Sequence, residues 1–132
     1  MLTNGTLDAL LLFAEYLAAG LALLAIFTFL YMWVTPYDDV KDIKDGHLAP
    51  AVALSGAMLG FTFPILVASY THAGFIDFVG WALIASIVQL CVFWALHGLL
   101  PRVIETNNTA GAMCFAMASV CAGLINAASF VP

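Results

Sequence analysis

The stretch Ala9–Val34, ALLLFAEYLAAGLALLAIFTFLYMWV, is a continuous apolar run in which Glu15 is the only charged residue. About 20 residues of α-helix, each rising roughly 1.5 Å, cross a hydrocarbon core about 30 Å thick. The run is longer than this, and its residues do not alternate between apolar and polar as those of a β-barrel strand do. It therefore predicts a transmembrane helix near the start of the chain.

Three further runs share this character: Ala49–Tyr70, Phe78–Leu100 and Ala110–Val131. The whole chain is 64% hydrophobic and 8% charged, whereas a soluble domain is about 45–50% apolar and about 25% charged. A soluble four-helix bundle needs a polar face on every helix, which so few charged residues cannot supply. The sequence predicts an all-α polytopic membrane protein, with four transmembrane helices in a single domain over residues 1–132 and the lipid bilayer as its main partner.

Composition and motifs exclude several classes of function. The net charge of −5 argues against nucleic-acid binding, and no phosphate-binding loop, nucleophile elbow or zinc-protease motif occurs, so we expect a protein that is not an enzyme. Cys91, Cys114 and Cys121 fall within the runs without a C-x-x-C pair, which is typical of packing residues. His47 and His97 lack the paired repeat of a haem site, and we expect no cofactor and no metal.

The distribution of positive charge predicts the orientation. Lys41, Lys44 and Arg102 are the only Lys and Arg residues, and they lie in the loops Pro36–His47 and Pro101–Asn107. These loops follow the first and third runs and therefore face the same side of the membrane. Because cytoplasmic loops carry the excess of Lys and Arg, we expect both loops inside and both termini outside, in the periplasm.

The chain reads as two tandem helix-loop-helix repeats, one over about 7–70 and one over about 76–131. In each repeat the first run ends at a proline that opens a polar loop, Pro36 and Pro101, and proline rarely continues a helix. Alanines also recur at a constant spacing between the second runs of the two units: Ala49, Ala51 and Ala57 against Ala110, Ala112 and Ala118. Both repeats would have the same orientation in the membrane, because a two-helix unit returns to its starting side.

Small residues mark the second run of each repeat. Gly56 and Gly60 form one small-x-x-x-small pair, and Ser119 and Gly123 form another. Such pairs let helix backbones approach closely in lipid, where packing drives helix association. We expect these four residues to pack helices together at the centre of the protein and to support a homo-oligomer.

Several motifs give the chain a family resemblance. The segment Tyr31–Pro64 reads YMWVTPYDDVKDIKDGHLAPAVALSGAMLGFTFP, and N-N-T-A-G-A at Asn107–Ala112 and G-L-I-N-A-A-S at Gly123–Ser129 follow. Together they resemble the bacterial inner-membrane family typified by YjfL, known as domain of unknown function 350, although His47, Pro50 and Glu15 depart from its pattern. The resemblance covers nearly the whole chain. It implies four helices, two tandem repeats and an inner-membrane location, but no particular chemistry.

Three polar residues within the runs form a candidate ion or proton site: Glu15, Gln89 and Asn126. A charged acid within a span costs about 2.5–3.5 kcal/mol at the bilayer centre and should face a polar partner or water. Glu15 and Asn126 lie at similar depths, and we expect them to meet across two helices. Alternatively, the Glu15 carboxyl group extends to the lipid headgroups or forms a hydrogen bond to a neighbouring helix. Gln89, in turn, could serve only as a hydrogen bond between helices.

Two hypotheses of function follow. The first is a structural or accessory inner-membrane component that assembles as a homo-oligomer through its small-residue helices, with other membrane proteins or membrane-stress proteins as further partners. The second is a small channel or transporter for ions, protons or cationic solutes that uses Glu15 and Gln89. The charged segment Asp38–Asp45 is expected to be a solvated loop that caps the following helix.

Overall fold

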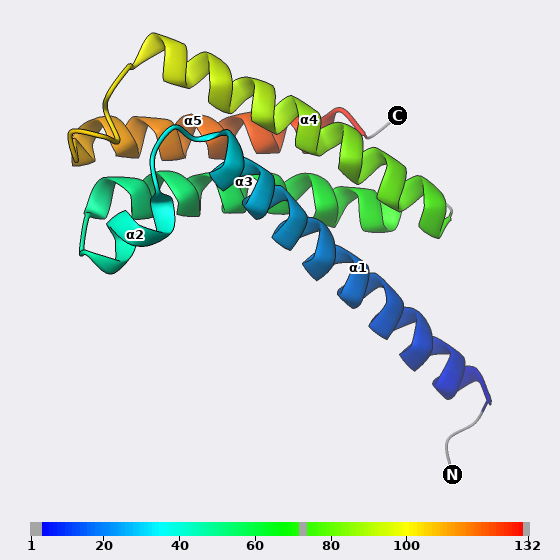
Figure 1. The fold of residues 1–132 in the computed structure, drawn as a ribbon. Helices are drawn as coiled ribbons and strands as arrows, with labels where there is room; N and C mark the ends of the chain where they lie inside the picture. The colour runs from blue at the N-terminus through cyan, green and yellow to red at the C-terminus, as the bar shows by residue number, and fades with distance from the viewer. Residues whose placement is uncertain (1–3, 72–73, 131–132) are drawn as a thin grey trace.

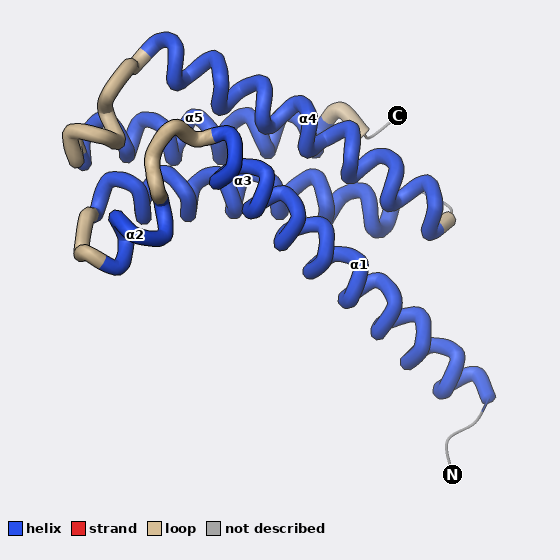
Figure 2. The backbone as a smooth tube through the Cα atoms, viewed as in Figure 1, coloured by secondary structure: helices blue, strands red, loops and turns tan. Residues whose placement is uncertain are grey.

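The computed structural model describes residues 4–71 and 74–130, and in these residues the regular structure is helical (Figures 1 and 2). The helices are α1 (Asn4–Val34), α2 (Asp39–Lys44), α3 (Leu48–Thr71), α4 (Phe75–Leu99) and α5 (Thr109–Ala128). All except the short α2 are long and apolar enough to cross a membrane. The prediction of an all-α protein with four candidate membrane-spanning helices is therefore confirmed.

Helices α3 and α5 form the centre of the fold. They run side by side in one direction, while α1 and α4 run in the other (Figure 1). Small residues bring the two central backbones together, because a Cβ built on Gly56 would overlap the backbone of Ala116 and one built on Gly123 would overlap the backbone of Gly60. Close approach of this kind is the usual basis of helix packing in lipid.

The buried positions of α3 and α5 show a common spacing. Buried Ala49, Ala53 and Gly60 on α3 have counterparts in buried Ala112, Ala116 and Gly123 on α5. This pairing of α3 with α5 is shifted by two residues from the pairing of alanines found in the sequence. In the sequence pairing, buried Ala49 corresponds to exposed Ala110. The pairing based on buried residues is the relevant one, because packing constrains only the face that each of the two helices presents to the other. The organisation as two tandem repeats stays a prediction.

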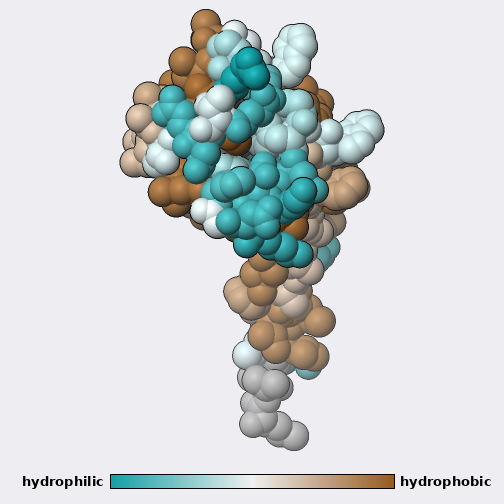
Figure 3. Space-filling model, turned by 60° about the vertical axis from the view of Figure 1, so that its left-hand side comes forward, coloured by the Kyte–Doolittle hydropathy of each residue, from teal (hydrophilic) through white to brown (hydrophobic). Residues whose placement is uncertain are grey.

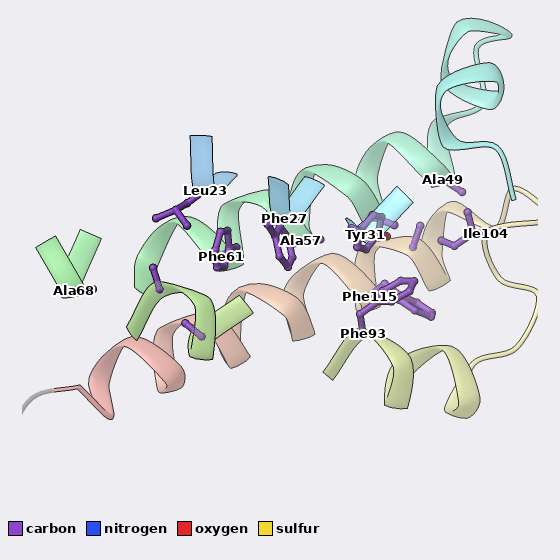
Figure 4. Close-up of a cluster of buried hydrophobic side chains, with 14 of the residues drawn as sticks. Leu23, Phe27, Tyr31, Ala49, Ala57, Phe61, Ala68, Phe93, Ile104 and Phe115 are labelled. Atoms are coloured by element: carbon purple, nitrogen blue, oxygen red, sulfur yellow. The ribbon is translucent and has the colours of Figure 1, made fainter. Parts of the chain in front are cut away.

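Helix α1 is buried mainly over its C-terminal half. Leu23, Phe27 and Tyr31 are buried, and the Phe27 ring stacks on Phe61 of α3 with centroids 4.3 Å apart (Figure 4). Toward its N-terminus α1 leans away from the other helices, and its large apolar side chains there are exposed (Figure 1). Apart from Tyr16, whose ring packs against α4, the N-terminal half of α1 is therefore in contact with lipid or with another protein.

Side-chain caps fix the loops at the end of the bundle that carries α2. The Asp38 carboxylate accepts a hydrogen bond from the Lys41 amide at 3.1 Å, at the start of α2. The Asn107 side chain, in the loop before α5, accepts one from the Ala49 amide of α3 at 3.0 Å. Such acceptors satisfy helix amides that have no partner within their own helix. Hydrophilic side chains gather at this end, which we call the α2 end (Figure 3).

Candidate functional site

The structure places the three predicted ion-site residues in different surroundings. Glu15 is exposed on the N-terminal half of α1. Asn126 is buried and donates a hydrogen bond from Nδ2 to the Ala85 carbonyl of α4 at 3.1 Å. Gln89 is buried and donates from Nε2 to the Ser119 carbonyl of α5 at 2.8 Å. The expected meeting of Glu15 and Asn126 does not occur within one chain, because the Asn126 amide is used between α4 and α5.

Gln89 joins three helices at one point. Its side chain, 2% exposed, reaches from α4 to Ser119 of α5 and lies against Gly60 of α3, where an added Cβ would be 2.7 Å from Nε2. Gly60 therefore makes room for both the α5 backbone and the Gln89 amide. This arrangement corresponds to a polar bond between packed helices rather than to a hydrated path.

The four predicted packing residues lie between α3 and α5 of a single chain. Gly56, Gly60, Ser119 and Gly123 are all buried there. They are covered within the chain, so they do not form the surface for a second copy that the sequence suggested. The reason is that both small-residue helices belong to the same chain and pack against each other.

A group of polar side chains lies near the α2 end, where α1, α2 and α4 approach one another. We call it the α2 polar cluster, and it consists of Tyr31, Thr35, Tyr37, Asp39 and His97. The Thr35 hydroxyl lies 2.8 Å from Asp39 Oδ2 and donates to it. The Tyr31 hydroxyl is within electrostatic range of Tyr37 and Asp39, and the Tyr37 and His97 rings are 6.4 Å apart between centroids. Residues from three helices and the α1–α2 connection thus meet at this point.

Burial sets the acid–base character of this cluster. It raises the pKa of Asp39 to about 6; the Thr35 hydrogen bond opposes this shift, whereas the negative charges of Asp42 and Asp38 add to it. Burial and the Asp39 carboxylate also raise the pKa of Tyr37 above its ordinary value. The Asp39 carboxyl group therefore changes its charge under mildly acidic conditions.

Sequence reasoning missed this cluster. It assigned Asp39 to a solvated loop, whereas the side chain is 2% exposed. One signal was available, because Tyr31, Thr35 and Asp39 follow one another at intervals of four residues and would share a face if the chain continued as a helix. Pro36 hid that signal by marking a helix end. No group of three or more His, Cys, Asp or Glu side chains suited to a metal ion occurs among the described residues.

Four apolar helices around a small-residue seam, with polar side chains gathered at the α2 end, define a multi-pass helical membrane protein. The model of the family described as Domain of Unknown Function (DUF350) matches residues 5–130. The chain belongs to this family, as the resemblance of its motifs predicted.

Curated relatives support the same assignment. The chain is 34% identical over 125 residues to the UPF0719 inner membrane protein YjfL of Escherichia coli K12, covering 92% of this chain and 95% of the relative. It is 26% identical over 102 residues to the UPF0719 transmembrane protein YshE of Bacillus subtilis, covering 74% and 76%. No solved structure matches it significantly. The location is therefore the inner membrane, which the chain crosses several times.

Proposed function

We propose that this protein is a structural or accessory component of the bacterial inner membrane that assembles as a homo-oligomer through the N-terminal half of α1. It carries out no reaction of its own and holds no cofactor. The α2 end, with Lys41, Lys44 and Arg102, faces the cytoplasm, and both termini face the periplasm. Contacts with other membrane proteins would form around this assembly.

The observation that carries the proposal is the exposure of Glu15. The residue lies on a helix whose neighbouring Leu11, Leu12 and Leu17 are also exposed. In a lone chain the carboxyl group would face lipid, at a cost that approaches about 2.5–3.5 kcal/mol near the bilayer centre. A second copy that covers α1 removes this cost, because it replaces lipid with groups that can hydrogen-bond to the carboxyl.

A groove between α1 and α3 provides a place for the second copy. It has a volume of about 470 Å³ and an almost wholly apolar lining. Tyr16, Thr62 and Ser69 are among its lining residues, together with the apolar Phe13 and Leu66. Tyr16 follows Glu15 directly in the chain, so a partner helix that enters this groove would lie close to the carboxyl group.

The transport hypothesis has weaker support. It required a polar path past Glu15 and Gln89, but Gln89 is buried in the seam and bonded to Ser119, whereas Glu15 is on the surface of the chain. A path that uses Glu15 would have to form between copies of the protein. Oligomerisation is therefore the first property to test under either hypothesis.

Site-directed cross-linking in native membranes tests the assembly. The exposed Cys91, Cys114 and Cys121 are replaced by serine, and a single cysteine is introduced at Leu12 of α1 or, as the control, at the equally exposed Ile87 of α4. A disulfide forms only when the two Cα atoms approach within about 7 Å. We expect oxidation to give covalent dimers with Leu12→Cys and monomers with Ile87→Cys.

The role of the carboxyl group is tested in the Leu12→Cys protein. Glu15→Gln keeps hydrogen-bonding groups and should preserve most of the cross-linking, whereas Glu15→Leu should reduce it several-fold. Monomers at every oxidant concentration, with cysteine positions on α1 no more reactive than those on α4, would contradict the proposed assembly.

A further inference from the structure

The α2 polar cluster contains buried polar atoms that have no hydrogen-bond partner. Among the described residues five buried side-chain atoms are unpaired, and four of these belong to the cluster: Tyr31 OH, Tyr37 OH, Asp39 Oδ1 and His97 Nδ1. An unpaired buried polar group is costly because it has lost its hydrogen bonds to water, so native proteins usually supply it with a partner. The Tyr31 and Tyr37 hydroxyls are close enough to interact with each other, whereas Asp39 Oδ1 and His97 Nδ1 have no such neighbour. The cluster therefore has hydrogen-bonding capacity that the described residues do not fill.

The surroundings of the cluster hold these atoms in place. Tyr31 is fully buried, and its ring packs against Phe93 of α4 with centroids 4.5 Å apart (Figure 4). The centroid of the Phe93 ring in turn lies 6.0 Å from the centroid of the His97 ring. Thr35 occupies only Oδ2 of Asp39 and leaves Oδ1 unpaired. The unpaired atoms are thus contributed by α1, the α1–α2 connection, α2 and α4, and apolar contacts shield them from solvent.

The chemistry of the four atoms matches water and a proton. Two phenol groups can donate hydrogen bonds, while a carboxylate oxygen and a neutral imidazole nitrogen can accept them. A single water molecule accepts two hydrogen bonds and donates two, and buried waters commonly bridge such groups. An anion is disfavoured by Asp39 and by Asp38, Asp42 and Glu105, whose charges act on the cluster.

We propose that the α2 polar cluster is a buried proton-binding site, in which ordered water joins Asp39 Oδ1 to Tyr31, Tyr37 and His97. At mildly acidic pH the proton is on the Asp39 carboxyl, which is then neutral and suited to its buried position. At higher pH the carboxylate carries a buried charge near Asp38 and Asp42, and this charge favours separation of α2 from the bundle. The other charged groups near the cluster are Lys41 and Lys44 on α2 itself and Glu105, which acts on Tyr37. His47 follows α2, and its Nδ1 lies 3.5 Å from Asp42.

The raised pKa of Asp39 supports this site, and the direction of the shift predicts how the stability of the protein depends on pH. The folded value of about 6 lies above the ordinary value of 3.8, so the folded state binds the proton more tightly than the unfolded state. The resulting stabilisation is fully present below about pH 4 and is lost as the pH rises through about 6. The stability of the protein in detergent or bicelles should therefore decrease over this interval.

Infrared difference spectroscopy of the whole protein in lipid tests the site directly. Spectra at about pH 5 and about pH 8 should differ by the carbonyl band of a protonated carboxyl group, with a midpoint near the Asp39 pKa of about 6. Asp39→Asn should remove this band. Asp45→Asn, at an exposed position on the same loop, should leave it unchanged and is the matched control.

Two further measurements test the proposal even if the Asp39→Asn variant does not fold. Tyr37→Phe removes one donor from the water, and we expect it to shift the midpoint of the wild-type band upward because the carboxylate loses indirect stabilisation. The unfolding midpoint of the wild-type chain should decrease between about pH 4 and about pH 7. A midpoint near the ordinary Asp value, or a band that persists in Asp39→Asn, would overturn the proposal.

Discussion

The seam between α3 and α5 and the contact of α1 with the bundle are built by opposite means. In the seam, Gly60 and Gly123 bring two backbones together with little side chain between them. Along α1, Phe27 and Tyr31 insert large rings between helices, and the buried contacts lie mainly in the C-terminal half of the helix. Lipid is as apolar as these side chains, so both contacts depend on packing rather than on escape from water.

The contrast separates a rigid part of the molecule from an adaptable one. A backbone contact has no side chain that can move aside, so the seam tolerates few changes. An aromatic contact at one end of a long helix leaves the rest of that helix able to meet another chain. The seam thus sets the fold, and α1 is the element available for assembly. Three substitutions test this division.

Gly123→Ala should be the most damaging of them. The added methyl group overlaps the Gly60 backbone, so α3 and α5 must separate. We expect the free energy of unfolding in bicelles to fall by about 3 kcal/mol. Gly80→Ala is the matched control, because a Cβ on Gly80 of α4 meets no atom within 4 Å. A similar small effect at both positions would show that the seam is not rigid.

Phe27→Ala should have an intermediate effect. Phe27 is 1% exposed and stacks on Phe61, so truncation leaves a cavity beneath α1. Such a change costs about 3–5 kcal/mol in a water-soluble core, but lipid removes much of the transfer contribution, and we expect about 2 kcal/mol. The control is Phe29→Ala, 65% exposed on the same helix, which should leave the unfolding free energy nearly unchanged. Equal losses would mean that α1 is not held by its buried face.

Gln89→Leu should have the smallest effect. Side-chain hydrogen bonds between membrane helices contribute about 0.6 kcal/mol on average, and leucine fills a volume comparable to that of glutamine without its polar atoms. The free energy of unfolding should therefore fall by less than about 1 kcal/mol. Asn126→Leu, which removes the bond to Ala85, provides a comparison at a second bond of the same kind. A loss above about 2 kcal/mol for Gln89→Leu would make hydrogen bonding, not backbone packing, the main cohesion of the seam.

Much of the fold could be predicted from residue type alone, but the candidate sites could not. The four spans followed from hydrophobicity and length, and Gly60 and Gly123 were recognised as packing residues because their size permits close approach. Their partners were not predictable, since a small residue shows that a backbone can approach without showing which one. The partners of the polar residues were equally unpredictable, because Asn126 could form a hydrogen bond to any helix that has a polar group at the same depth in the membrane.

The amino-acid sequence alone established that lipid surrounds this protein, that four helices cross it and that the chain resembles its family, because these properties depend on local composition and motifs. Only the tertiary structure decided that Glu15 is exposed, that the small-residue helices pack within one chain and that Asp39 is buried and bonded to Thr35. These facts depend on how helices cross and where a loop folds back. Such geometry arises from contacts between residues far apart in the chain, and no local pattern records it.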